Sequence, residues 1–215
     1  MKLAMRNGIY VAICLVVAAA GVWPDLHHHQ GTRQIEVARA NNQSTENNSR
    51  EGADKHMRQP INWRKSSETI PYPDLAKAQH LWIKVSLKGN RTYIYDGDKL
   101  IYTMYSTGGM YKKDHSTGKV KSMTPTGTFY SQAERGDNFY NQQLGEGANY
   151  YVSWLNHGEY LFHSVPTKSD GSYNVKEAKK LGKSTGSHGC IRLSVPDAQW
   201  FSSNLPVGTK IEIVN

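Results

Sequence analysis

From about residue 81 onward, apolar and polar side chains alternate, and this pattern restricts the possible folds of the chain more than any other feature. The run from Leu81 to Leu87 has an apolar residue at every second position, which is the two-residue period of a half-buried strand. Two more short apolar runs, 93–95 and 101–104, flank Asp-Gly-Asp-Lys at 96–99, which is typical of a hairpin turn. We therefore predict that an antiparallel β-meander opens the folded domain.

Two short helices are expected among the remaining strands. Ser194 can act as a helix N-cap, with Pro196 in the first turn, and Gly182 can close a helical segment that begins at Val175. The predicted fold class is mainly β, a sandwich or barrel-like sheet with one or two short helices. We expect the other strands to end at 129–130 and to cover 150–155, 160–163 and 209–214, with polar loops at 106–122 and 131–148.

The 215 residues divide into three predicted regions. Residues 1–23 have a basic start, an apolar run and small residues at its end, which indicates a secretory signal peptide; an uncleaved membrane anchor is the alternative. Residues 24–79 are polar with no sustained period, so we expect a disordered linker that cannot bury enough apolar area to fold. Residues 80–215 form the predicted catalytic domain. Its expected location is outside the cytoplasm, in the cell envelope.

The segment 184–193, Ser-Thr-Gly-Ser-His-Gly-Cys-Ile-Arg-Leu, contains the candidate nucleophile Cys190. Glycines on both sides of Ser187 and His188 permit tight backbone geometry that can aim N–H groups at a ligand. The only other cysteine, Cys14, lies in the apolar N-terminal run. An unpaired thiol in an exported protein is open to oxidation, so we interpret Cys190 as present for its reactivity; the alternative is a small buried core cysteine.

Two histidines are candidates for the base that a catalytic thiol needs, and we expect a neighbouring imidazole to hold the Cys190 sulfur as an anion. His163 ends an apolar strand-like run, and His188 lies two residues before Cys190. Spacing alone does not decide between them. Arg192 either binds a substrate carboxylate or forms a structural salt bridge. We expect no metal or other cofactor, because no acidic or further cysteine ligand accompanies His163, His188 and Cys190.

The formal net charge of +8 favours an anionic partner. The basic residues are spread over both halves of the chain rather than gathered in a run, which excludes nucleic acid as the expected partner and fits a polyanionic envelope.

The histidine at 163 followed by Ser-His-Gly-Cys at 187–190 resembles the hallmark of the L,D-transpeptidases, the family named for the YkuD domain. The resemblance covers roughly residues 81–215 and includes Thr-Pro-Thr-Gly-Thr-Phe at 124–129 and Gly-Thr-Lys-Ile-Glu-Ile at 208–213. The spacing from His163 to Ser187 is longer than we expect for the family, so we predict a lid-like insertion at 167–183.

This resemblance implies that Cys190 attacks a peptidoglycan stem peptide, releases D-alanine and forms a thioester, which a neighbouring stem's amine resolves into a 3→3 cross-link. It also implies that His163 transfers the proton, with the Ser164 carbonyl orienting its other nitrogen. We assign His188 to positioning substrate or the loop, and Ser187 to substrate binding. The backbone N–H groups of Gly189 and Cys190 are the expected oxyanion donors.

Two other functions stay open from the sequence. An L,D-carboxypeptidase or other wall-peptide hydrolase on the same fold would differ only in using water to resolve the thioester. A non-catalytic module would bind the wall through its basic charge. We expect contact with a membrane only through the N-terminal segment, and a monomer.

Overall fold

The computed structural model describes residues 55–215, which form a nine-stranded sheet, a separate two-stranded sheet and short helices. No helix within these residues is long and apolar enough to cross a membrane. The signal or anchor expected at 1–23 and the first part of the linker lie outside them. In chain order the elements are η1 (Leu75–Lys77), β1 (Leu81–Ser86), β2 (Arg91–Asp96), β3 (Lys99–Thr107), β4 (Tyr111–Lys113), β5 (Val120–Ser122), β6 (Gly127–Tyr130), β7 (Arg135–Asn141), β8 (Glu146–Leu155), β9 (Tyr160–Ser164), α2 (Val175–Ala178), β10 (Ile191–Leu193), α3 (Val195–Asn204) and β11 (Lys210–Val214).

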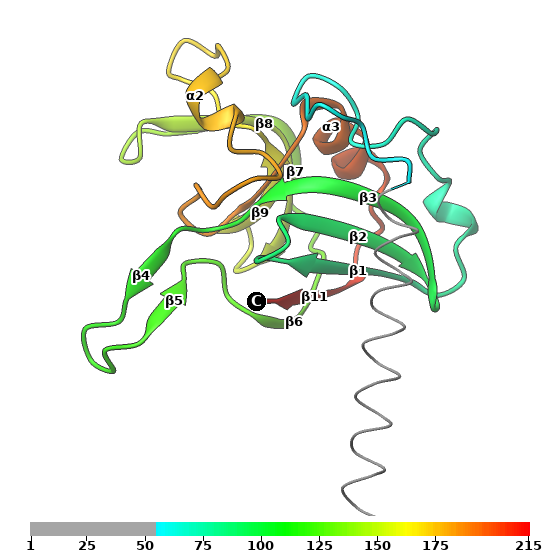
Figure 1. The fold of residues 1–215 in the computed structure, drawn as a ribbon, viewed down its shortest axis with the longest axis horizontal. Coiled ribbons are helices and arrows are strands. Elements are labelled where there is room, and N and C mark those ends of the chain that lie inside the picture. The colour runs from blue at the N-terminus through cyan, green and yellow to red at the C-terminus, as the bar shows by residue number, and fades with distance from the viewer. Residues whose placement is uncertain (1–54) are drawn as a thin grey trace, which may run out of the picture. The chain divides into compact units, whose positions relative to one another are not determined.

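The large sheet has the strand order β6-β11-β1-β2-β3-β10-β9-β8-β7. Most neighbours are antiparallel, including the predicted meander β1-β2-β3, but β1 with β11 and β10 with β9 are parallel. The sheet curls so that its two halves face each other, with α3 beside the β8–β9 half (Figure 1). The predicted mainly β, barrel-like fold is confirmed.

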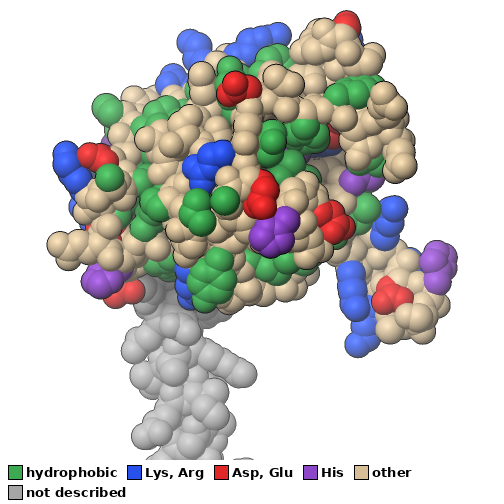
Figure 2. All heavy atoms as spheres, turned by 180° about the vertical axis from the view of Figure 1, so that it is seen from behind, with side chains coloured by type: hydrophobic (Ala, Val, Ile, Leu, Met, Phe, Trp, Pro, Cys, Tyr) green, Lys and Arg blue, Asp and Glu red, His purple; other side chains and the backbone are tan. Residues whose placement is uncertain are grey.

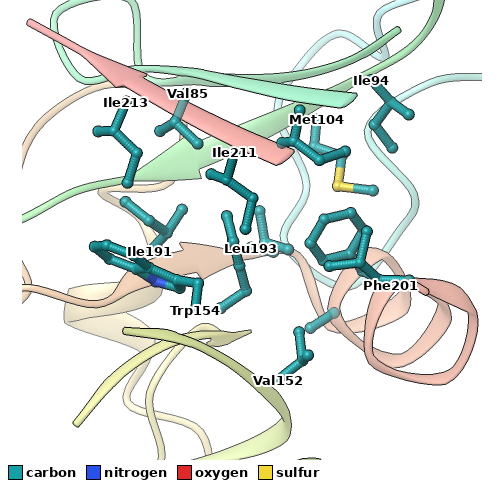
Figure 3. Close-up of a cluster of buried hydrophobic side chains, with 14 of the residues drawn as sticks. Val85, Ile94, Met104, Val152, Trp154, Ile191, Leu193, Phe201, Ile211 and Ile213 are labelled. Carbon is teal, nitrogen blue, oxygen red and sulfur yellow. The ribbon is translucent and has the colours of Figure 1, made fainter. Parts of the chain in front are cut away.

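The core fills the space between the two halves of the sheet. Ile83 and Val85 of β1 and Ile211 and Ile213 of β11 face it from one half, because alternate residues of a strand point to one side. Figure 3 shows these strands across from the other half and from α3. The buried side chains that the second half and the helix supply include Val152, Trp154, Phe162, Ile191, Leu193 and Phe201.

The predicted linker is wrong for residues 55–79, which pack on the domain. Met57, Trp63 and Leu75 are buried, although this part of the chain shows no strand or helix period. Asp197 in α3 anchors the segment: its fully buried carboxylate accepts hydrogen bonds from the Ser67 N–H and hydroxyl and, at 2.8 Å, from the Tyr72 hydroxyl. Scattered apolar residues and one buried acceptor therefore order a polar segment that composition alone marks as unfolded.

Two predicted loops also contain strands. The segment 131–148 was expected to be a loop, but it forms β7 and the start of β8, paired from Arg135 opposite Val152 to Asn141 opposite Glu146. The polar loop after Thr107 contains the hairpin β4–β5. Strands β4, β5 and β7 are largely exposed and lack apolar alternation. The pattern used to find strands therefore does not appear in them.

We predict that Asp197→Ala destabilises the protein by about 3 kcal/mol or more, because it leaves buried donors of Ser67 and Tyr72 without an acceptor. The segment 55–79 should then become sensitive to limited proteolysis. The measurement is urea unfolding with protease mapping. Asp98→Ala, in an exposed turn, is the matched control and should change the free energy of unfolding by less than about 0.5 kcal/mol. An equal effect of both variants would contradict the anchoring role.

Candidate active site

Parallel pairing of β9 with β10 brings the two predicted catalytic segments together. In this register Ile191 lies opposite Phe162, and Arg192 lies opposite His163. Cys190, just before β10, then reaches the edge of β9: its sulfur accepts the Leu161 N–H at 3.4 Å and its S–H points to the Glu159 carbonyl at 3.7 Å. Cys190 therefore lies at a loop-to-strand junction.

Hydrogen bonds within the cysteine loop hold it in one conformation. The buried Ser187 hydroxyl donates to the Cys190 carbonyl and accepts the Gly189 N–H at 3.1 Å. Gly189 has φ of +140°, and a Cβ there would come within 2.7 Å of the Tyr160 ring. Only glycine fits this position without displacing the ring. The serine predicted to contact substrate thus has an observed role inside the loop.

A second segment of the chain holds the loop from outside. The Thr124 hydroxyl donates to the Gly189 carbonyl at 2.8 Å and accepts the Gly109 N–H at 2.7 Å. The N–H groups of Gly186 and Ser187 both donate to the Gly108 carbonyl. The segment at 124–129 was recognised in the sequence only as part of a family pattern, and its first residue turns out to support the cysteine loop directly.

Cys190 opens into a cavity of about 420 Å³. His163 and His188 both line it, as does Ser187, so the structure gathers four of the predicted site residues at one place. His188 is exposed at the cavity, whereas His163 is only 3% exposed. The rest of the wall consists of Glu134, Phe139, Asn141, Leu144, Glu146, Tyr151, His157, Gly158, Glu159 and Leu161.

His163 is held as a neutral imidazole with a defined tautomer. Its Nδ1–H donates to the Ser164 carbonyl at 2.6 Å, which is the contact predicted for this pair. Nε2 consequently carries no proton and can accept one. Burial, with the positive charge of Arg192 as a second cause, lowers the pKa of His163 to about 3. The hydrogen bond to Ser164 works in the opposite direction but is the smaller effect.

Cys190 is a neutral thiol in the resting structure, which corrects the expectation that a nearby imidazole holds its sulfur as an anion. Burial raises the pKa of Cys190 to about 11, against lowering by the Leu161 N–H and by the charge of Arg192. At neutral pH the resting pair is therefore a thiol and an unprotonated imidazole. A nucleophilic attack by this sulfur would require the thiol to lose its proton during the attack.

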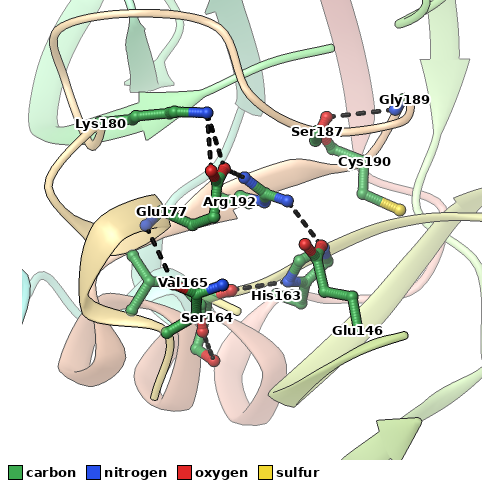
Figure 4. A network of polar contacts seen from close by, with 11 residues as sticks. Glu146, His163, Ser164, Val165, Glu177, Lys180, Ser187, Gly189, Cys190 and Arg192 are labelled. Atoms are coloured by element: carbon green, nitrogen blue, oxygen red, sulfur yellow. Dashed lines mark hydrogen bonds and ion pairs between the residues drawn. The ribbon is translucent and has the colours of Figure 1, made fainter. Parts of the chain in front are cut away.

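Arg192 is 1% exposed and ion-paired at both ends of its guanidinium. One terminal nitrogen lies 3.0 Å from Oε2 of Glu177 in α2, and the other lies 2.5 Å from Oε1 of Glu146 in β8. Figure 4 shows the guanidinium between the two glutamates, with Lys180 on the far side of Glu177. The arrangement matches the salt-bridge alternative. Binding a substrate carboxylate through Arg192 stays a prediction, and it would require these pairs to open.

The insertion 167–183 does not line the cavity, so its predicted lid position is wrong. Glu177 attaches it to Arg192, beneath the cysteine loop. The hairpin β7–β8 forms that wall instead and contributes Phe139, whose ring meets the His163 ring edge-on at 5.5 Å between centroids. Sequence analysis missed this hairpin because it was taken for a loop. The aromatic residues Phe139 and Tyr151 were the sequence feature that could have indicated strands there.

The fold and the site together define a class of protein: a curled β domain with a thiol and an imidazole in one cavity. Residues 80–213 match the family model described as the L,D-transpeptidase catalytic domain (YkuD). The chain belongs to this family, which confirms the resemblance. It is 46% identical over 160 residues, 74% of this chain and 77% of the relative, to the Bacillus subtilis (strain 168) protein named "Putative L,D-transpeptidase YciB".

Solved structures with similar folds include a fused Zn-dependent amidase/peptidase/peptidoglycan-binding protein from Clostridium acetobutylicum ATCC 824. It is 33% identical with a TM-score of 0.44, and the match covers 63% of this chain and 52% of that one. An L,D-transpeptidase from Mycobacterium smegmatis is 18% identical with a TM-score of 0.47, and the match covers 63% of this chain and 59% of that one. The match thus spans little more than half the length of either structure.

We predict that His163 makes the protein lose stability on acidification. Its pKa is about 3 when folded and 6.5 ordinarily, so the unfolded chain binds the proton first. Stability present above pH 6.5 is then lost as the pH falls toward 3. Between pH 7.5 and 4.5, protonation linked to His163 should lower the free energy of unfolding by on the order of 2.5 kcal/mol. Urea unfolding of wild type and His163→Asn measures the difference, and parallel pH curves for the two proteins would contradict it.

We predict that alkylation of Cys190 by iodoacetamide, without substrate, accelerates about tenfold per pH unit from 7 to 10, following the thiolate fraction. The physical reason is that the pKa of the Cys190 thiol is raised to about 11, so the thiolate fraction is small and grows with pH over this range. The Cys190→Ala variant, which keeps Cys14, provides the background rate. A rate that levels off at or below neutral pH would instead indicate a thiolate–imidazolium pair.

Proposed function

We propose that this chain is a cysteine-dependent L,D-transpeptidase that joins peptidoglycan stem peptides by 3→3 cross-links through a thioester. The observation that carries the proposal is that Cys190 and an unprotonated His163 nitrogen share one cavity. Family membership supports the reaction class, since L,D-transpeptidases act on peptidoglycan peptides. The nucleophile, the thioester and the cross-link type are our assignments.

In the first half-reaction, the Cys190 sulfur attacks the carbonyl of the third stem residue while its proton passes to Nε2 of His163. A carbon–sulfur bond forms, and the carbonyl oxygen becomes an oxyanion. The imidazolium then gives its proton to the nitrogen of the departing D-alanine as the carbon–nitrogen bond breaks. The Ser164 carbonyl keeps the ring oriented throughout, because the Nδ1–H bond stays in place in both protonation states.

The developing negative charge needs a donor near Cys190. Of the two predicted N–H groups, that of Gly189 already donates to the Ser187 hydroxyl. We therefore assign the oxyanion to the Cys190 N–H and give the Gly189 N–H a supporting role in loop geometry. His188, exposed at the cavity, is placed to position the bound peptide. Ser187 stabilises the cysteine loop through its hydrogen bonds to Gly189 and Cys190.

In the second half-reaction, the side-chain amine of a neighbouring stem attacks the thioester. His163 takes the proton of the attacking nitrogen, and the Cys190 sulfur leaves and is reprotonated. Burial and, after it, the positive charge of Arg192 disfavour the imidazolium between these steps. His163 therefore returns to its neutral form and is ready for the next proton. We propose that the reaction takes place outside the cytoplasm, in keeping with the export pattern predicted for residues 1–23.

We predict that a carbapenem acylates the full chain once, on Cys190, because its strained carbonyl offers the sulfur the same attack. Intact mass spectrometry at neutral pH under reducing conditions detects the adduct, and peptide mapping locates it. Cys190→Ala should show none, whereas Ser169→Ala, an exposed residue outside the cavity, should behave as wild type. No adduct on the wild type would count against the enzyme assignment.

Stem tetrapeptides incubated with the enzyme separate transfer from hydrolysis. Cross-linked dimers that lack one D-alanine support the transpeptidase, and tripeptides without dimers would reassign the chain to L,D-carboxypeptidase activity. A chain that keeps wall binding but yields neither product would be the non-catalytic binding module.

A further inference from the structure

Residues 111–122, which we call the basic arm, project from the domain as a separate two-stranded sheet. Figure 1 shows β4 and β5 extending away from the large sheet, and Figure 2 shows the same projection from behind with Lys or Arg side chains along it. All three residues of β4 are exposed, and Val120 of β5 is 65% exposed. The arm therefore adds almost nothing to the core.

The arm concentrates positive charge. Four lysines against Asp114 give a net +3 over twelve residues, compared with +8 for all 215 residues. The lysines are Lys112, Lys113, Lys119 and Lys121. In a chain whose basic residues are otherwise dispersed, this is a strongly charged surface outside the cavity.

The register of the arm places two of these charges side by side. Lys112 lies directly opposite Lys121, so both side chains leave the same face. Like charges at opposed positions destabilise a strand pair. Asp114 offsets only part of this, because its carboxylate lies 3.6 Å from the ammonium of Lys121, whose side chain is 64% exposed to solvent screening. An isolated two-stranded hairpin is marginally stable even without such repulsion. A bound anion between the two ammonium groups would remove the cost.

The root of the arm is bonded to the cysteine loop. The Met110 N–H donates to the Ser187 carbonyl at 2.9 Å, and the Met123 N–H donates to the Met110 carbonyl at 2.8 Å. Directly after the arm, Thr124 holds the Gly189 carbonyl. Whatever binds the arm is therefore brought to a fixed position relative to Cys190.

We propose that the basic arm binds a linear, phosphate-bearing anionic polymer, and that it holds the domain on that polymer while the cavity works on a separate substrate. A lysine ammonium is a compact charge that suits phosphate. Two ammonium groups on opposed strands, with Cβ atoms about 5 Å apart, can donate to one phosphate together. A linear polymer supplies a further phosphate to Lys119, two residues before Lys121.

A polar hollow at the base of the arm extends this surface. It has a volume of about 220 Å³, and Lys121, Ser122 and Thr126 are among its lining residues. Hydroxyl and ammonium donors together favour phosphate, which presents several strong acceptor oxygens. The hollow is separate from the catalytic cavity, because none of the residues lining it lines the other.

The test measures binding of the full chain to long-chain inorganic polyphosphate, with polyglutamate as the carboxylate comparison. The arm variant replaces Lys112, Lys113, Lys119 and Lys121 by Gln. The matched control removes the same charge from four exposed lysines elsewhere: Lys65, Lys88, Lys99 and Lys183. Urea unfolding of each protein establishes that the fold is intact, and carbapenem acylation of Cys190 should proceed at the wild-type rate in both.

We expect the arm variant to lose at least about tenfold in polyphosphate affinity, and the control less than about threefold, since only phosphate-contacting lysines release counterions. The salt dependence of log Kd should fall by about one for each contacting lysine in the arm variant alone. Equal losses in the two variants would show that only bulk charge matters and would overturn the proposal. Polyglutamate binding as tight as polyphosphate binding would overturn the phosphate assignment. Neither result depends on transpeptidase activity, so failure here and failure of the proposed function are distinguishable.

Discussion

The parallel pairing of β9 with β10 is the constraint on which the site depends. These strands are separated by 26 residues in the chain, yet their register alone sets Arg192 beside His163 and brings the Cys190 sulfur to the Leu161 N–H. Parallel neighbours require a crossover connection, and here residues 165–190 supply it, ending in the cysteine loop. The connection that the topology demands thus also brings Cys190 to the strand that contains His163.

Burial shapes the chemistry as strongly as geometry does. His163 and Cys190 both lose hydration, and each moves toward its uncharged form, with pKa values of about 3 and 11. Arg192 cannot become neutral, so its burial requires the carboxylates of Glu146 and Glu177. These glutamates come from β8 and α2, and the ion pairs therefore tie the cavity wall and the insertion to the strand that follows Cys190. A resting neutral pair also protects the sulfur, because a thiol is less easily oxidised than a thiolate.

The domain separates its core from its exposed hairpins. Ile83, Ile211 and Trp154 belong to a closed core between the halves of the sheet. The largely exposed strand β7 lines the cavity, and β4–β5 forms the basic arm. The two hairpins extend from the domain in different directions in Figure 1. The exposed residues of β7 and of the basic arm can change in charge and shape without disturbing the core, because they pack against few buried side chains.

The sequence by itself determined the strands with clear alternation, the α3 cap at Ser194, and the cysteine and histidine of the site, because period and local chemistry are encoded over a few residues. It did not reveal β7, the packing of residues 55–79 or the partners of Arg192. Those features depend on groups distant in the chain, such as Asp197 accepting from Ser67 across 130 residues. The protonation state of the Cys190 thiol was likewise decided only by the tertiary structure, since a pKa depends on burial and on nearby charges, and folding alone sets both.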